Sequence, residues 1–135
     1  MNAINFIDKL AYIHIVNGEI LMALGKGKQT YYIPGGKREE VESDEQALIR
    51  EVKEEFTVHL IPETIEFYGV FSAQAHDKPE GVMVRMTCYT ADYIGDIKPS
   101  SEIEEIAYYT YAQKDIVSPV GKIIFDDLKN KCLIN

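Results

Sequence analysis

Apolar residues near the start of the chain form two extended runs that flank a tight turn. Residues 10–24 read LAYIHIVNGEILMAL, and the Asn17-Gly18 pair between the two runs predicts a β-hairpin. Both alternating sets of positions in the first run are largely apolar, so we expect a strand that is covered on both faces. A third run, residues 31–33, ends abruptly at Pro34-Gly35-Gly36, where we expect the backbone to turn tightly.

The hydrophobic period then becomes helical. Leu48, Val52 and Phe56 recur every four residues, and Ser43 with Gln46 matches a capping box. We therefore expect a helix from Ser43 to Phe56.

Strand-like runs return after Pro62, and a second helix follows near the end of the chain. The expected elements are strands over residues 67–76, 82–93 and 106–111, a polar turn over 77–81, and an acidic loop around Glu102, Glu104 and Glu105. Ser118 and Pro119 fit the N-cap and first position of a helix that runs to about residue 133. This order of elements predicts one α/β (α+β) domain over residues 1–135, with a mixed sheet between helices.

Composition narrows the class of protein. The 135 residues are 46% hydrophobic, and 14 Lys+Arg against 22 Asp+Glu give a net charge of −8. This charge disfavours a non-specific nucleic-acid binder and a protein held on an anionic membrane surface. No apolar run approaches the roughly 20 residues that span a bilayer. Asp8 interrupts the only stretch that would serve as a signal peptide core, so we expect a cytoplasmic protein.

Three carboxylates share one face of the first predicted helix. Glu51, Glu54 and Glu55 are spaced i, i+3 and i+4, beside the apolar stripe. Like charges at this spacing destabilise a helix by a few tenths of a kcal/mol each, which a bound cation would offset. Hard oxygen ligands suit Mg²⁺ or Mn²⁺. On the helix alone, however, a solvated Glu/Lys face is the better explanation.

The surrounding segment resembles the Nudix box. Five residues separate Gly36 from Glu42, and seven separate Glu42 from Arg50-Glu51-Val52. One residue then precedes Glu54-Glu55, and one more precedes Thr57-Val58. The order of elements over the whole chain also looks like a Nudix domain, an α/β/α sandwich. One position departs from the family pattern, which has glycine where Thr57 stands. We expect Thr57 to adopt an ordinary conformation that opens the extended segment after the helix.

The resemblance implies a metal site on this helix. Glu51, Glu54 and Glu55 would bind Mg²⁺ or Mn²⁺, and a backbone carbonyl at Gly36 or Gly35 would complete the coordination. Glu54 or Glu51 would also act as the base that activates water.

Further roles follow from the same resemblance. Arg50 would belong to the catalytic set and would pair with Glu42 to hold the loop against the helix. One of the acidic residues Glu102, Glu104 and Glu105 would supply an additional carboxylate, although a solvated loop is at least as good an explanation for each. Candidates for substrate contact are Arg85, Gln74 and Tyr32, which alternate along expected strands or carry an aromatic ring.

The implied reaction is hydrolysis of a pyrophosphate bond in a nucleoside diphosphate linked to another moiety. A small-molecule nucleoside triphosphate is the default substrate of a MutT-like chain of this size, and Ala73 stands where ADP-ribose-specific members carry proline. Two alternatives stay open: a Nudix-fold sensor that binds nucleotides without cleaving them, and a pyrophosphohydrolase of RNA 5′ ends or caps, which the net charge disfavours. A homodimer is compatible with the sequence.

Overall fold

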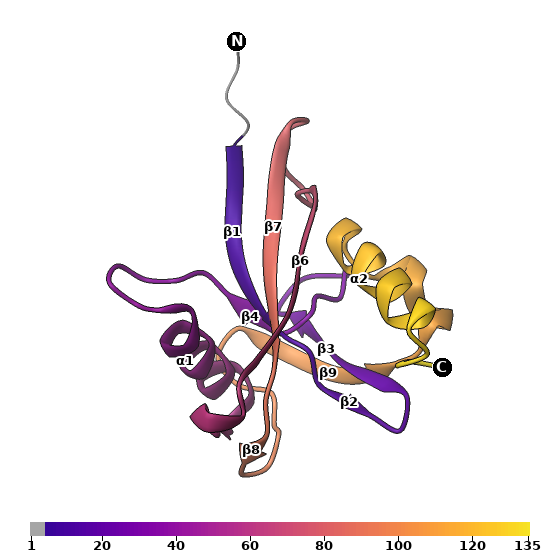
Figure 1. The fold of residues 1–135 in the computed structure, drawn as a ribbon. Helices are drawn as coiled ribbons and strands as arrows, with labels where there is room; N and C mark the ends of the chain where they lie inside the picture. Colours follow the sequence, from indigo (N-terminus) through magenta and orange to yellow (C-terminus); the bar gives the residue numbers. More distant parts are fainter. Residues whose placement is uncertain (1–4) are drawn as a thin grey trace.

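The computed structural model describes residues 5–135, which form three sheets and two α-helices (Figure 1). Residues 1–4, part of the segment judged above not to be a signal peptide, lie outside this range. The elements are β1 (Asn5–Tyr12), β2 (Ile15–Val16), β3 (Glu19–Gly25), β4 (Gly35–Gly36), α1 (Asp44–Phe56), β5 (His59–Leu60), η1 (Pro62–Thr64), β6 (Glu66–Gln74), β7 (Val82–Thr90), β8 (Tyr93–Ile94), β9 (Ile103–Tyr109), η2 (Tyr111–Ile116) and α2 (Pro119–Asn130). Neither helix among the described residues has the length and apolarity needed to cross a membrane.

The largest sheet is mixed, as predicted. Its strands lie in the order β4-β1-β7-β6, with β1 and β7 parallel and the other pairs antiparallel. A second sheet, β2-β3-β9, is antiparallel, and β5 pairs with β8. The predicted hairpin joins β2 to β3, with Asn17 at φ 52° and Gly18 at φ 78°, as a type I′ turn requires.

Successive residues from Leu10 to Ile13, at the end of β1 and just beyond it, pack in two different hydrophobic cores. Leu10 and Tyr12 pack in the core that contains the apolar stripe of α1, whereas Ala11 and Ile13 pack in the core that contains α2. The two helices therefore lie on opposite sides of the strands (Figure 1). The predicted α/β/α sandwich, with strands covered on both faces, is confirmed.

Helix α1 follows its sequence signals. The Ser43 hydroxyl accepts a hydrogen bond from the Gln46 amide at 3.1 Å, and the Gln46 side chain accepts one from the Ser43 amide at 2.9 Å. Leu48, Val52 and Phe56 are fully buried. Because this stripe fixes the rotation of the helix, it also fixes where the neighbouring glutamates point.

The segment around Pro34 differs from the prediction. Residues 31–33 make only isolated bridges, whereas Gly35–Gly36, expected as a turn, forms β4 against β1. Gly35 has a φ of 149°, and a Cβ at this position would collide with the carbonyl oxygen of Leu10. Only glycine allows so close an approach, so this pair is a strand pressed against β1.

Glu104 and Glu105 lie in β9 and not in the predicted acidic loop; only Glu102 precedes the strand. Both glutamates are exposed. The register between β9 and β3 shifts here, with Glu105 opposite Leu24 and Ile103 opposite Gly25, so Glu104 is the extra residue of a β-bulge at the start of the strand.

Four predicted elements end earlier in the structure, and two of them are β6, which ends at Gln74 instead of residue 76, and β9, which ends at Tyr109 instead of residue 111. β7 ends at Thr90, because the next backbone groups bond elsewhere: the Asp92 amide donates to Thr64 Oγ1 at 2.8 Å, and the Asp92 carbonyl accepts from Ile61. The last helix ends at Asn130.

The prediction for Thr57 is wrong. Thr57 caps α1 in the left-handed conformation, with φ 63° and ψ 19°, and its amide donates to the Lys53 carbonyl at 3.0 Å. Its hydroxyl donates to the Asp96 carbonyl at 2.9 Å. This bond offsets part of the strain that a β-branched residue meets in this conformation.

Candidate active site

Arg50 connects the glutamates of α1 to the preceding loop. Its Nε and Nη2 donate to the two oxygens of Glu42 at 2.7 and 2.8 Å, and Nη2 also donates to the Lys37 carbonyl at 3.0 Å. Its Nη1 donates to Glu51 at 2.9 Å and, more weakly, to Glu54 at 3.4 Å. The bond from Arg50 and a backbone amide lower the pKa of Glu42 to about 2. Glu42 and Arg50 thus form the predicted ion pair between loop and helix.

Glu55 and Glu51 are half-buried on the side of α1 that faces β4. Burial, followed by the negative charge of Glu51, raises the pKa of Glu55 to about 7. Burial also raises the pKa of Glu51, although its hydrogen bond from Arg50 opposes this. The amide of Gly35 donates to Glu55 Oε1 at a long 3.4 Å, and a Cβ on Gly36 would collide with the Glu51 carboxyl group. The two glycines of β4 therefore lie directly against these carboxylates.

The donor set fits a divalent metal ion. Glu51, Glu54 and Glu55 offer only hard carboxylate oxygens, and their mutual repulsion contributes to the raised pKa of Glu51 and of Glu55. In the conformation that residues 5–135 adopt, no three His, Cys, Asp or Glu side chains are grouped closely enough to hold a metal ion. Arg50 Nη1 instead engages both Glu51 and Glu54. Coordination by all three therefore requires these side chains to change rotamer.

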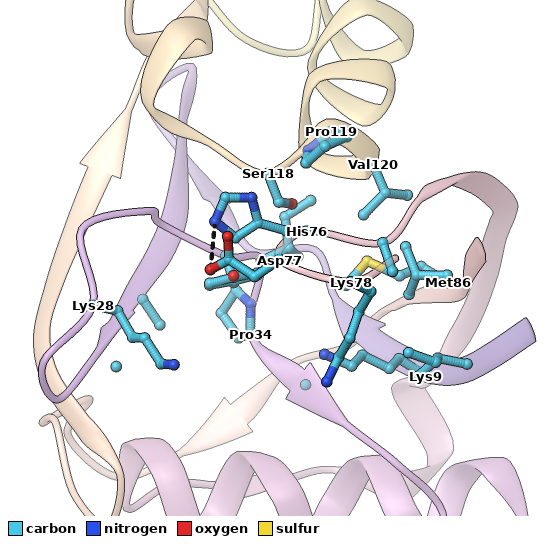
Figure 2. A pocket seen from close by; sticks show the side chains of 18 of the residues that line it. Lys9, Lys28, Pro34, His76, Asp77, Lys78, Met86, Ser118, Pro119 and Val120 are labelled. Carbon is cyan, nitrogen blue, oxygen red and sulfur yellow. Dashed lines mark ion pairs between the residues drawn. The ribbon is translucent and has the colours of Figure 1, made fainter. Parts of the chain in front are cut away.

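A cavity of about 380 Å³ adjoins this face of α1. Glu55 and Gly35 belong to its lining, so the buried end of the carboxylate face opens into the cavity. Figure 2 shows Lys9 and Lys78 on one side of the pocket and Lys28 on the other, with the first turn of α2 nearby. The pocket therefore has the Glu55 carboxyl group at its α1 end, and its other walls carry the three lysines together with the carboxyl groups of Asp77 and Glu102.

Three of the predicted additional residues line this cavity, namely Tyr32, Gln74 and Glu102. Arg85, Glu104 and Glu105 do not. Arg85 pairs with Asp8 at 2.8 Å and its guanidinium lies over the ring of Phe6, 4.6 Å from the centroid, so the expectation that it faces the cleft is not met. Glu105 accepts a hydrogen bond from the Tyr31 hydroxyl at 2.9 Å.

Gln74 lines the cavity and also forms hydrogen bonds within its own turn. Its amide nitrogen donates to the carbonyls of Pro79 at 2.9 Å and Lys78 at 3.3 Å, and its oxygen accepts from the Gly81 amide at 3.0 Å. These bonds close the turn between β6 and β7, so both polar groups of the Gln74 side chain are hydrogen-bonded to the backbone of that turn.

No sequence motif distinguishes the lysines that line the pocket. Lys9, Lys28 and Lys78 come from β1, the loop after β3 and the β6–β7 turn, which are far apart in the chain. The one available signal was Lys9, a charged residue inside an apolar strand run. Only the fold brings the three together.

The fold is similar to that of solved MutT-like proteins. The MutT protein of Methanosarcina mazei Go1 superposes with a TM-score of 0.74 at 18% identity, over 94% of this chain and 95% of that one. A MutT NUDIX hydrolase from Burkholderia pseudomallei gives 0.72 at 19% identity, over 90% and 97%. A bifunctional NMN adenylyltransferase/ADP ribose pyrophosphatase from Francisella tularensis, complexed with AMP and a Mn ion, gives 0.63 at 24% identity, over 95% and 42%.

No protein of curated function matches the sequence. The model of the NUDIX domain matches residues 10–124, which include most of the described elements and the whole of the box. Together with the MutT-like neighbours, this match supports a pyrophosphohydrolase, and the chain belongs to the NUDIX domain family.

Proposed function

We propose that this chain, acting as one catalytic domain, hydrolyses the pyrophosphate bond of a small-molecule nucleoside triphosphate with the aid of Mg²⁺ or Mn²⁺. Hydrolysis of a nucleoside diphosphate linked to another moiety is the general reaction of the family. The triphosphate substrate and the identity of the metal are the specific parts of the proposal.

One observation carries the proposal: Glu55 belongs both to the carboxylate face of α1 and to the lining of the 380 Å³ cavity. A substrate in the cavity would therefore place its phosphates next to the metal ligands. Lysines on the cavity walls suit the negative charge of a polyphosphate chain.

Each residue of the box has a proposed role. Glu51, Glu54 and Glu55, with the Gly36 carbonyl, would hold the metal, which when bound supplies Lewis-acid polarisation of phosphate oxygens and lowers the pKa of water. Glu54 or Glu51 would accept the proton of the attacking water. Arg50 donates to both of these carboxylates through its Nη1, while its pairing with Glu42 fixes the guanidinium.

Two observations on similar proteins support the substrate and the metal. Two of the structural neighbours are described as MutT proteins. The Francisella tularensis neighbour binds AMP and a Mn ion. A nucleotide and a divalent metal are therefore the ligands to test first.

The test is a nucleotide panel with Mg²⁺, Mn²⁺ or EDTA, read by separate detection of phosphate and pyrophosphate. We expect pyrophosphate from a nucleoside triphosphate and no turnover in EDTA. Glu54→Gln should lower kcat about 100-fold or more with little change in melting temperature, because Glu54 is exposed. Glu63→Gln, an exposed glutamate outside the pocket, is the matched control. Binding of nucleotides without any turnover would instead support a sensor.

A further inference from the structure

Lys9 is a half-buried cation that forms no ion pair with the residues that the structure describes. It projects from β1 into the cavity, with its Nζ 5.8 Å from the centroid of the Tyr32 ring. Burial lowers its pKa. Burial removes part of the hydration of the ammonium group, and an anionic ligand bound next to it compensates for this cost in free energy.

Lys78 faces Lys9 from the β6–β7 turn. The two ammonium groups converge in Figure 2. After burial, the positive charge of Lys37 and then that of Lys78 lower the pKa of Lys9, whereas the negative charges of Glu55 and Glu51 raise it. Two like charges that converge on one side of a cavity repel each other. A phosphate group accepts hydrogen bonds from both and replaces this repulsion with attraction.

The backbone position of Lys78 depends on Gln74. The Gln74 side chain makes hydrogen bonds to the backbone of Lys78, Pro79 and Gly81, which together close the turn. Pro79 restricts the turn further because its φ is fixed. The turn therefore presents Lys78 to the cavity in one preferred arrangement.

We propose that Lys9 and Lys78 form a two-lysine subsite for a phosphate group of the substrate, and that Gln74 is a positioning residue that holds the turn carrying Lys78. The inference deepens the proposed function and rests on it. Because an uncharged sugar leaves both lysines without a counter-charge, the subsite favours nucleoside triphosphates over nucleoside diphosphate sugars.

The first experiment measures binding and requires no turnover. Inorganic tripolyphosphate is titrated by calorimetry into the full chain in EDTA at low ionic strength. Lys9→Met and Lys78→Met should each weaken binding about tenfold, as expected for the loss of one charge-assisted hydrogen bond. Lys129→Met is the matched control, because Lys129 is an exposed lysine at the far end of α2.

Failure of the wild type to bind tripolyphosphate, or equal binding by wild type and both pocket variants, overturns the subsite. This readout is separate from the proposed function. A chain that hydrolyses nucleotides while the lysine variants bind normally refutes only the subsite. A chain without activity whose lysine variants lose binding refutes only the proposed reaction.

The second experiment separates positioning from a general structural effect of Gln74. With a nucleoside triphosphate, Gln74→Leu and Lys78→Met should each raise KM about tenfold and leave kcat within about twofold. If Gln74 acts through Lys78, the double variant should be no worse than Lys78→Met alone. Additive KM effects in this cycle overturn the positioning role, even if Gln74→Leu lowers the melting temperature.

Discussion

The carboxyl group of Glu51 occupies the space that a side chain at position 36 would need. Gly36 lies on β4, which pairs with β1, whereas Glu51 lies on α1. The strand and the helix thus approach closely at Gly36, where the strand has no side chain. The position of the Glu51 carboxyl group therefore depends on this glycine.

Gly36→Ala should therefore displace Glu51 and lower kcat about 10- to 100-fold, the scale expected for a shift of about 1 Å in a catalytic group. The measurement is steady-state turnover of the best substrate from the panel, together with a melting curve. Gly69→Ala is the control, because a Cβ on Gly69 would meet only the Phe71 ring, at 3.1 Å. Full activity of Gly36→Ala would show that the Glu51 position does not matter.

Divalent metal ions should stabilise the folded chain. Glu51, Glu54 and Glu55 repel one another, and an ion bound only by the folded state raises stability by mass action. We expect Mg²⁺ and Mn²⁺ at millimolar concentration to raise the melting temperature more than Na⁺ at equal ionic strength. The shift should shrink in Glu55→Gln. Equal shifts with all three salts would indicate simple screening and contradict the metal site.

The raised pKa of Glu55 predicts a pH-dependent stability without metal. The folded chain keeps a proton on this carboxyl up to about pH 7, whereas the unfolded chain loses it near the ordinary glutamate pKa of 4.5. Stability should thus fall as pH rises from about 4.5 to 7 and stay low above 7. Glu55→Gln should melt higher than wild type at pH 8 in EDTA, with the difference vanishing near pH 4.5. A constant difference across this range would contradict the shift.

The left-handed backbone of Thr57 determines how substitutions at this position should change the free energy of unfolding. The conformation costs a non-glycine residue about 1–2 kcal/mol, but Thr57→Gly also loses the bond to the Asp96 carbonyl and adds unfolded-state entropy, each about 0.5–1 kcal/mol. We therefore expect Thr57→Gly to be nearly neutral in chemical denaturation.

Two further substitutions at this position separate these contributions. Thr57→Val keeps the branched side chain but lacks the hydroxyl, so it should be destabilised by about 1 kcal/mol. Thr57→Asn, which tolerates this conformation, should be the most stable of the three variants. A stable Thr57→Val would show that the hydroxyl contributes nothing.

Local signals predicted the parts of the fold that local chemistry determines. The cap at Ser43, the apolar stripe of α1 and the Asn17-Gly18 hairpin each involve residues close together in sequence, and all three are present. The pairing of Glu42 with Arg50 followed from the family resemblance and is also present.

The errors concern residues whose conformation depends on distant partners. Gly35–Gly36 forms a strand because β1 accepts it. Thr57 is the exception, because a left-handed residue is a common local way to end a helix, and the β-propensity of threonine favoured the wrong alternative. Glu104 and Glu105 look like loop residues until β3 is seen to pair with their strand. No local pattern specifies such contacts.

The parallel pairing of β1 with β7 sets an order for assembly. Asp8 and Arg85, which pair across these strands, are 77 positions apart. A growing chain on the ribosome can form the Asn17-Gly18 hairpin and the first turns of α1 early, but β1 has no neighbour on that side until β7 has emerged. Lys9 and the turn that precedes β7 are brought together by the same pairing, so the wall formed by Lys9 and Lys78 is complete only after β7 has emerged.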